Sequence, residues 1–400
     1  MIATRSHGIS EIEDFRRNKA LWKISPLAIS FIQVLFWLVS MAASSAAVSV
    51  PRLYLGTMTF GWSQASSPVT EAVAVELSKR AILGSSVPYL DSARIYAGGL
   101  TEPIVGACLR SLISADGKQP AKITTKAHPS QPQGLSRTGL EAQLRASLDA
   151  LGVEAVDEFY LHQPDTECNL AESLEVCHDF VKQGLIVRLG MSNYHASEVA
   201  RAVELCAANG WTQPTVYQGL YNPLNRAAEE TLLPLLREHN IDFVAYNALA
   251  AGLLTGKHDA KGGDVKVGRF KDNPNYMPRF YTDSNFRAVE TIKAALPEGL
   301  SLIGAVYQWL RRHSALSASD GILLGASSMA QLESNLDACA AAETAPDLPD
   351  ACLAAFDEAW RIVRDAEEGG GAFPYWRSYS KDMPGREGLD PGASYSAAKK

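Results

Sequence analysis

The sequence predicts an α/β protein folded as a (β/α)8 barrel, a TIM barrel, and three observations carry that prediction. Eight short apolar runs recur from residue 52 onward, and stretches with helical periodicity separate them. This alternation is typical of parallel βαβ units, and eight such units can close a barrel. The runs are Leu53–Met58, Tyr89–Asp91, Lys122–Lys126, Glu158–His162, Ile186–Ser192, Thr215–Gln218, Phe243–Tyr246 and Gly321–Leu324.

The third observation concerns the turn after the first run. A doubly wound open sheet shows the same alternation, but it would place a glycine-rich GxGxxG turn there to bind a dinucleotide. The residues at that point are Thr59-Phe60-Gly61-Trp62, which do not match. The barrel is therefore the preferred fold class.

Three segments follow from this reading: an N-terminal extension (1–50), the barrel (51–367) and a C-terminal tail (368–400). A long loop after strand 7, from Ala250 to about Asn285, is rich in Gly, Lys, Asp and Pro and has the length of a functional loop. The tail is a C-terminal extension that opens with three glycines. The stretch Phe373–Arg377 is too aromatic for a mere linker, and the last fifteen or so residues are expected to be disordered.

The N-terminal extension leaves two interpretations open. Residues 24–50 carry no charge, and Phe31–Val39 is strongly apolar, as in a targeting or membrane-anchoring segment. Met41 also opens a plausible start, in which case the first forty residues would be a gene-model extension. A standard signal peptide is disfavoured, because the preceding polar region is long and contains acidic residues.

Composition excludes several classes of protein. The chain has 37 Lys and Arg against 44 Asp and Glu, a formal net charge of −7, so no basic excess favours nucleic-acid binding. Six cysteines occur without a CxxC pair, and eight histidines occur without an HExxH motif. We therefore expect no metal site and no disulfide framework. Reduced, buried thiols and a cytoplasmic location fit best.

Four polar residues stand where the predicted strands end. Asp91, Lys126 and His162 close the second, third and fourth strands, and Tyr96 lies five residues after Asp91. Strand ends meet at one mouth of a barrel, so these side chains can converge.

Together the four side chains suit carbonyl reduction by hydride. A tyrosine is a poor acid near pH 7 unless a cation stabilises its phenolate, which Lys126 could do while Asp91 holds it. His162 could hydrogen-bond the oxygen on which charge develops. A structural ion pair and a core histidine are the alternatives.

These residues lie in stretches that resemble the aldo-keto reductase family, in its aflatoxin-aldehyde and succinic-semialdehyde reductase branch. The likeness covers about residues 52–377, in order. The matching stretches are Leu90–Tyr96, Ile123–Lys126, Tyr160–Asp165, Gly190–Tyr194, Pro214–Gly219, Ala245–Asn247, Gly252–Lys257 and Leu324–Ser328.

The resemblance implies NADPH/NADP+ as the cofactor and Tyr96 as the general acid, with Lys126, Asp91 and His162 completing a tetrad. It implies that the nicotinamide is bound by Ser192, Asn193, Gln218 and Tyr246. It implies that a turn over the pyrophosphate includes Asn247, Leu249, Gly252, Leu254, Gly256 and Lys257. It assigns to the adenosine end Gly325, Ser327, Gln331 and Asn335, with Arg269 also on the cofactor side.

For the substrate, the resemblance implies a small-molecule carbonyl compound bound by His162, Tyr276, Arg279 and Tyr375, with no metal. Arginine suits an aldehyde that bears a carboxylate, through bidentate pairing. The expected reaction is the NADPH-dependent reduction of aldehydes, including semialdehydes and dialdehydes, to alcohols. The branch is commonly dimeric, which implies a homodimer.

This chain departs from the family pattern at several positions. Ala248 and Ala251 replace an expected Pro and Gly in the pyrophosphate turn, and Arg94 stands where relatives often carry an apolar residue. Two further functions remain open: an alcohol or sugar dehydrogenase that runs the reaction in reverse, and an NADP-binding, redox-sensing subunit of a membrane protein.

Overall fold

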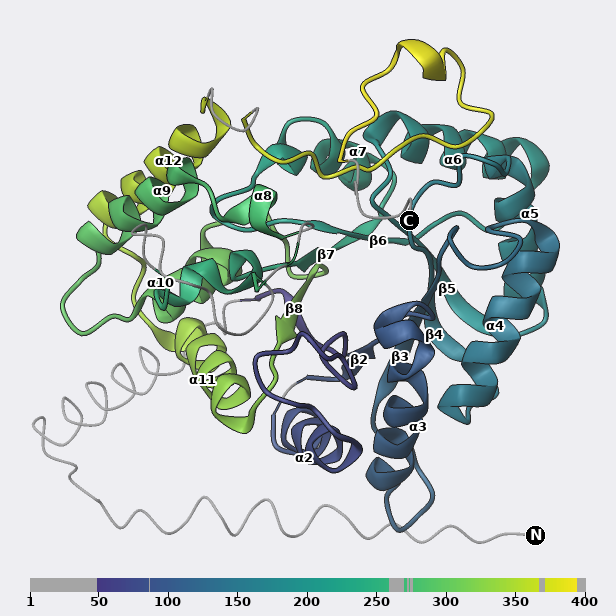
Figure 1. Ribbon diagram of the computed structural model, residues 1–400, viewed down its shortest axis with the longest axis horizontal. Coiled ribbons are helices and arrows are strands. Elements are labelled where there is room, and N and C mark those ends of the chain that lie inside the picture. The colour runs from purple at the N-terminus through teal and green to yellow at the C-terminus, as the bar shows by residue number, and fades with distance from the viewer. Residues whose placement is uncertain are drawn as a thin grey trace, which may run out of the picture. The chain divides into compact units, whose positions relative to one another are not determined.

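The computed structural model describes residues 49–85, 87–258, 270, 271, 273, 276–366 and 371–393. These belong to the compact unit Ser49–Lys400. Eight parallel strands close a barrel in chain order, β1 to β8, and Figure 1 shows the helices outside this ring. The strands are β1 (Arg52–Gly56), β2 (Tyr89–Asp91), β3 (Lys122–Ala127), β4 (Val156–Leu161), β5 (Ile186–Ser192), β6 (Val216–Leu220), β7 (Asp242–Tyr246) and β8 (Gly321–Gly325).

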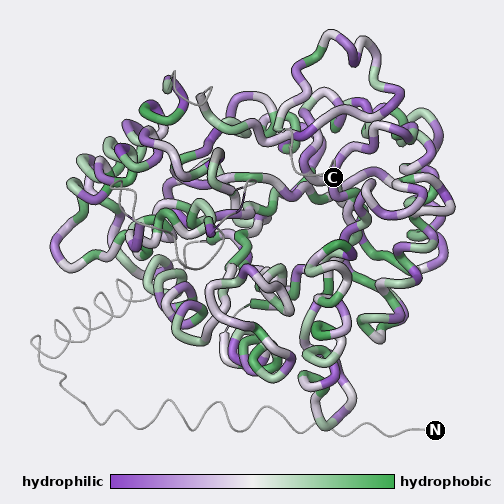
Figure 2. The backbone as a smooth tube through the Cα atoms, in the orientation of Figure 1, coloured by the Kyte–Doolittle hydropathy of each residue, from purple (hydrophilic) through white to green (hydrophobic). Residues whose placement is uncertain are grey.

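Helices follow each of the eight strands, as the sequence predicts. They are α2 (Glu71–Ile82), α3 (Thr101–Leu112), α4 (Arg137–Leu151), α5 (Leu170–Lys182), α6 (Ala196–Asn209), α7 (Leu232–Glu238), α10 (Leu302–Arg312) and α11 (Met329–Thr344). Three more helices are α8 (Met277–Phe280), α9 (Asp283–Ala294) and α12 (Asp350–Arg364), and the 3-10 turns are η2 (Tyr96–Gly99), η3 (Ala227–Glu229), η4 (Ala250–Thr255) and η5 (Arg386–Gly388). Figure 2 shows hydrophobic and hydrophilic residues alternating along the outer helices.

The predicted barrel is confirmed, and each strand coincides with one of the eight apolar runs to within one or two residues at its ends. The strands appear in the sequence as continuous apolar runs because both of their faces are buried. One face packs against the helices, and the other faces the barrel interior. Large rings fill that interior: Tyr54, Tyr89 and Tyr160 are buried with Val216 and Val244. The barrel is thus a packed core, and its chemistry is confined to the mouth.

The loop after β7 contains elements that its composition does not reveal. It opens with η4 and continues through α8 into the start of α9. Arg269, which the sequence assigns to the cofactor side, lies outside the described residues.

Residues 371–393, which we call the C-terminal strap, run alongside α6 and α7 (Figure 1). Disorder is predicted for about the last fifteen residues, and those up to 393 form hydrogen bonds in the structure. Arg386 Nη1 donates to the carbonyl of Thr166 at 3.0 Å, and the Ala393 N–H donates to the carbonyl of Trp376 at 2.8 Å. Gly392 (φ 71°) marks a tight turn under the Trp376 ring and not a flexible linker, because an added Cβ would lie 2.4 Å from that ring.

The predictions for the first forty-eight residues, including the apolar run Phe31–Val39, and for residues 394–400 lie outside the described residues. Within the described ranges no helix is long and apolar enough to cross a membrane. The six cysteines are buried free thiols, as the sequence predicts.

Candidate active site

A buried ion pair lies at the carboxyl ends of β2 and β3. Lys126 Nζ lies 2.7 Å and 2.9 Å from the two carboxylate oxygens of Asp91, and the side chains are 0% and 1% exposed. The same ammonium donates to the carbonyl of Ser92 at 2.7 Å. Asp91 Oδ2 also accepts hydrogen bonds from Thr124 Oγ1 at 2.7 Å and Gln218 Nε2 at 2.9 Å. The carboxylate is therefore fixed by side chains from two other strands, β3 and β6.

The ammonium of Lys126 faces the predicted acid. Its Nζ lies 5.2 Å from the centroid of the Tyr96 ring. Burial lowers the pKa of Lys126, and the adjacent charge of Asp91 opposes that shift. A cation held beside the ring can stabilise the phenolate that remains after Tyr96 gives up its proton.

Tyr96 is presented to the mouth by a sharp turn after β2. It opens η2, in which Ala97 (φ 48°) and Gly98 (φ 65°) both have left-handed backbone conformations. Such a conformation is costly for alanine and tends to occur at functional sites. The Tyr96 ring lies edge-to-face with His162, with centroids 5.8 Å apart.

His162 is partly buried directly after β4, and its buried Nδ1 has no hydrogen-bond partner within the described part of the chain. Burial, together with the neighbouring His128, Lys126 and Arg377, holds the pKa of His162 well below its usual value. The imidazole is therefore neutral near pH 7, and a neutral imidazole can donate one hydrogen bond to a substrate oxygen.

Polar side chains at the ends of β5 to β7 lie next to this tetrad. Asn193 (φ 62°) donates from Nδ2 to the carbonyl of His162 at 2.8 Å and to Ser192 Oγ at 2.9 Å, and its Oδ1 accepts from the Tyr246 hydroxyl at 2.7 Å. Gln218 reaches Asp91, as noted above. Amide and hydroxyl groups with a neighbouring aromatic ring suit a planar carboxamide such as nicotinamide.

The turn after β7 has an unusual backbone. Asn247 (φ 55°), Ala250 (φ 47°), Ala251 (φ 58°) and Gly252 (φ 112°) are all left-handed. Ala251 therefore adopts a conformation that costs a non-glycine residue about 1–2 kcal/mol. Leu254 is buried and Gly256 (φ 73°) closes the turn, whereas Lys257 is exposed. The chain thus keeps a left-handed turn here without the glycine that the family pattern leads one to expect at 251.

The predicted adenosine end is a connected polar cluster. Gln331 Oε1 accepts from the N–H of Ser327 at 2.9 Å and from its hydroxyl at 3.1 Å, and Gln331 Nε2 donates to Ser66 Oγ at 3.2 Å. Asn335 Nδ2 donates to the carbonyl of Gly325 at 3.2 Å. The sequence missed Ser66, because the loop after β1 carries no motif that marks it.

Residues 52–358 match the model of the Aldo/keto reductase family. The chain belongs to that family. It is 40% identical over 333 residues to aflatoxin B1 aldehyde reductase member 2 of Mus musculus, covering 80% of this chain and 88% of the relative. It is 39% identical over 325 residues to aldo-keto reductase family 7 member A3 of Homo sapiens, covering 78% and 95%. It is also 34% identical over 303 residues to oxidoreductase sirO of Leptosphaeria maculans, covering 73% and 89%.

The predicted family is thereby confirmed, and this aldo-keto reductase is an oxidoreductase of a family that uses nicotinamide cofactors. The relatives support aldehyde reduction as its chemistry. Within the described ranges no group of His, Cys, Asp and Glu side chains is arranged to hold a metal ion.

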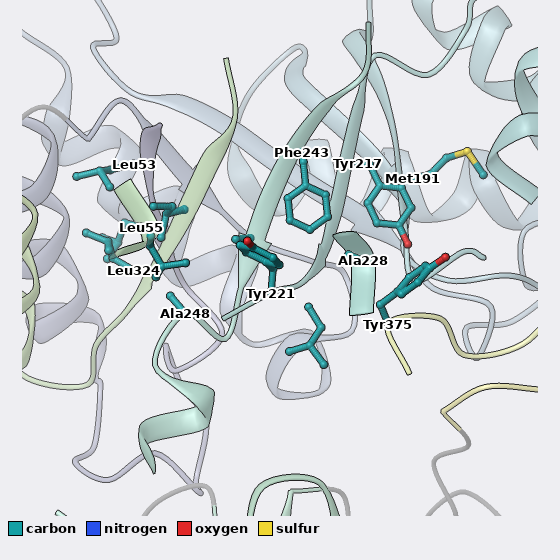
Figure 3. Packing of buried hydrophobic residues seen from close by; sticks show 14 of the residues in the cluster. Leu53, Leu55, Met191, Tyr217, Tyr221, Ala228, Phe243, Ala248, Leu324 and Tyr375 are labelled. Atoms are coloured by element: carbon teal, nitrogen blue, oxygen red, sulfur yellow. The ribbon is translucent and has the colours of Figure 1, made fainter. Parts of the chain in front are cut away.

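The substrate residues predicted for this aldo-keto reductase lie in different surroundings. The Tyr276 hydroxyl lies 3.9 Å from Met58 Sδ, and the Arg279 guanidinium lies 4.1 Å from the centroid of the Phe373 ring. Tyr375 is only 2% exposed and lies among buried side chains beside Tyr217 (Figure 3).

The Tyr375 hydroxyl is directed at α6 and α7. It accepts from the N–H of Ala196 at 3.2 Å and lies 3.2 Å from Thr231 Oγ1. The tyrosine therefore anchors the strap, and its assignment to the substrate stays a prediction.

Arg377 is a site residue that the sequence did not assign. Its Nη1 donates to Gln163 Oε1 at 3.0 Å, and its charge lowers the pKa of both His128 and His162. The resemblance offers a signal, because Tyr375–Arg377 is similar to an aromatic-Arg ending of the reductase branch and would cap the pocket. Of these two tail residues, Arg377 is the one whose charge acts on His162.

Arg94 has a buried counter-charge. Its Nη1 lies 2.6 Å from Glu102 Oε2, and Glu102 is fully buried and also accepts from Thr125 Oγ1 at 2.6 Å. The positive charge that set this chain apart from its relatives is therefore largely neutralised before it can act on a substrate.

Proposed function

We propose that this aldo-keto reductase reduces aldehydes to alcohols with NADPH, with Tyr96 as the general acid. One observation carries the proposal: the buried ammonium of Lys126, paired with Asp91, lies 5.2 Å from the Tyr96 ring centroid. A bound dihydronicotinamide supplies the hydride that adds to the carbonyl carbon. The aldehyde, the hydride and one proton together give the alcohol, and NADPH leaves as NADP+.

The protein's part is to deliver that proton and to stabilise charge. The Tyr96 hydroxyl donates its proton to the carbonyl oxygen, and the Lys126 ammonium stabilises the phenolate that is left. Asp91 keeps the ammonium in place without water. The neutral imidazole of His162 donates a hydrogen bond to the same oxygen, where charge develops.

The residues around the tetrad fit the proposed cofactor. Ser192, Asn193 and Gln218 would pair with the carboxamide, and Tyr246 would lie against the ring. The left-handed turn that starts at Asn247 would pass over the pyrophosphate, since strained backbone of this kind tends to occur at ligand sites. The cluster of Ser327, Gln331, Asn335 and Gly325 would hold the adenosine. The preference for NADPH over NADH rests on the likeness to the reductase branch.

Aldehydes that carry a carboxylate are the proposed substrate class, alongside dialdehydes. The Arg279 guanidinium lies over the Phe373 ring and that of Arg377 bonds Gln163, which follows β4, and arginine pairs with carboxylates in a bidentate manner. The names of the relatives specify an aldehyde, which agrees with this class. A homodimer and a cytoplasmic location, the latter suggested by free thiols, complete the proposal.

The test is a steady-state assay of NADPH oxidation with butanal and with succinic semialdehyde, for wild type and Tyr96→Phe. Loss of the general acid is expected to lower kcat by about 10²–10⁴-fold. Binding of NADPH, followed by fluorescence, should change little. Turnover in Tyr96→Phe within about twofold of wild type would refute the assignment. Tight NADPH binding with negligible turnover of any aldehyde by the wild type would favour the redox-sensing alternative.

A further inference from the structure

The C-terminal strap lies beyond the residues that match the family model, 52–358, and yet it reaches the active site. The N–H of Arg377 donates to the carbonyl of Asn193 at 3.1 Å, next to the proposed nicotinamide position. The Arg377 guanidinium bonds Gln163 and acts electrostatically on His162. A single strap residue therefore touches both the cofactor side and the catalytic side of the mouth.

The residues that follow Arg377 anchor the strap to α5 and α6. The N–H of Ser380 donates to Glu198 Oε1 at 2.9 Å, and the N–H of Lys381 donates to the carbonyl of Asp165 at 3.0 Å. Asp382 Oδ1 accepts from the N–H of Leu170 at 2.9 Å.

Asp382 also forms an ion pair. Its Oδ2 pairs with Arg201, and both side chains are mostly covered, at 23% and 19% exposed. Three successive strap residues, 380 to 382, are thus each held by the barrel, and the first lies three residues after Arg377.

We propose that residues 380–382, with Glu198 and Arg201, form a clasp that positions Arg377 at the mouth for substrates that carry a carboxylate. The inference rests on the proposed function and adds to it the element that makes it selective. An arginine near a chain end would otherwise lose backbone and side-chain entropy each time it met a ligand. Because the clasp fixes Arg377 when the protein folds, this entropy is already lost before a carboxylate binds, and the carboxylate meets a cation in position. Asp382 and Arg201 are positioning residues, since they act through Arg377.

The experiment compares the full-length wild type with four variants. These are Asp382→Asn, a shortened chain that ends at Arg377, Arg377→Ala, and Arg386→Ala as the matched control. Arg386 is a strap cation that bonds only the carbonyl of Thr166 among the described contacts and lies outside the clasp. KM and kcat are measured with succinic semialdehyde and with butanal, a neutral aldehyde of the same carbon number. Binding of succinate, an unreactive dicarboxylate, is measured by protein fluorescence.

Arg377→Ala is expected to raise KM for succinic semialdehyde about tenfold or more, the value of one charged hydrogen bond. Asp382→Asn and the shortened chain should raise it at least about threefold. Succinate affinity should fall in parallel, whereas in Asp382→Asn and the shortened chain kcat and the KM for butanal, measured at neutral pH, should stay within about twofold. Arg386→Ala should match the wild type. A strap that serves only stability would move both aldehydes together.

The clasp is refuted if Arg377→Ala weakens succinate binding while Asp382→Asn and the shortened chain do not. It is also refuted if all the clasp variants affect butanal as strongly as the semialdehyde. Failure of the proposed function looks different, because turnover would be absent in the wild type with every aldehyde. Succinate binding would still report on the clasp in that case.

Discussion

Replacing Glu198 by glutamine should remove a pH dependence from the docking of the C-terminal strap. Glu198 is fully buried on α6, and its Oε1 accepts the N–H of Ser380. Its Oε2 and the Ser380 hydroxyl have no hydrogen-bond partner within the described ranges. Burial, opposed by the hydrogen bond from the Ser380 N–H and by Arg201, raises the pKa of Glu198 to about 7. Burial penalises the charged carboxylate, so the docked state favours the protonated acid.

The sign follows from linkage. The pKa of Glu198 is higher in the docked state than its ordinary 4.5, so the stability it contributes is full below pH 4.5 and is lost as the pH rises through about 7. The whole shift corresponds to about 3 kcal/mol. Between about pH 5.5 and pH 8 the opening constant of the strap should rise about 30-fold.

The other titratable groups around Glu198 either change protonation outside the range from about pH 5.5 to pH 8 or contribute equally to wild type and Glu198→Gln, so that their effect cancels. The pKa of Asp382 is lowered, and those of Tyr194 and Tyr379 are raised. The pKa of His195 is lowered from 6.5, so it takes up its proton towards the acid end. Since Glu198→Gln leaves all of these in place, the ratio of wild type to variant isolates one carboxyl group.

Hydrogen exchange of the amides of Ser380 and Lys381 measures this opening, because both N–H groups bond to the barrel in the docked state. Protection factors, corrected for the intrinsic pH dependence of exchange, are compared for wild type and Glu198→Gln. The ratio should change about 30-fold across the range, with the variant the better protected at pH 8. A ratio that stays constant within about threefold would show that Glu198 does not titrate there, and the reasoning would fail.

Three further predictions concern the barrel and the tetrad. Asp91→Asn leaves a buried ammonium without its counter-charge and should lower the free energy of unfolding in urea by about 3–5 kcal/mol; a loss below about 1 kcal/mol would contradict the burial of the pair. Gly190→Ala places a Cβ 2.4 Å from a tyrosine ring in the barrel and should cost about 1–3 kcal/mol in the same assay, whereas Gly388→Ala, with open space around it, should be near neutral. Burial is the main cause of the low pKa of His162, and the charge of Arg377 lowers it further. Arg377→Ala should therefore raise the pKa of His162 and move the acid limb of kcat/KM for butanal to higher pH. An unmoved limb would count against this coupling.

The barrel and the tetrad were predictable because both follow from local rules that add up. Each strand is apolar on both faces, so it appears in the sequence as a continuous apolar run. The residue at the end of each run lies at the mouth of the barrel. Asp91 and Lys126 are far apart along the chain, but the register of β2 against β3 makes their meeting a consequence of topology. Nothing beyond the strand pattern was needed to bring them together.

The strap and the surroundings of Arg94 were not predictable in the same way. The tail is rich in glycine and serine, which in composition suggests disorder, yet Gly392 permits a turn that only the Trp376 ring above it explains. The partner of Arg94 is Glu102, a glutamate that looks like an ordinary surface residue of α3 until the helix is packed. Such contacts depend on tertiary packing, which no local pattern encodes.

The strap carries Arg377, and the charge of this residue would have two effects at the mouth of the barrel. Arg377 would attract a carboxylate, and the same charge disfavours a second positive charge on His162. An undocked strap would therefore do more than weaken substrate binding, because His162 would also be protonated more easily at acid pH. Because Glu198 makes docking less stable as the pH rises, the cation is held most firmly under the acid conditions in which His162 would otherwise take up a proton. The clasp thus connects substrate selection to the protonation state that the proton-transfer step requires.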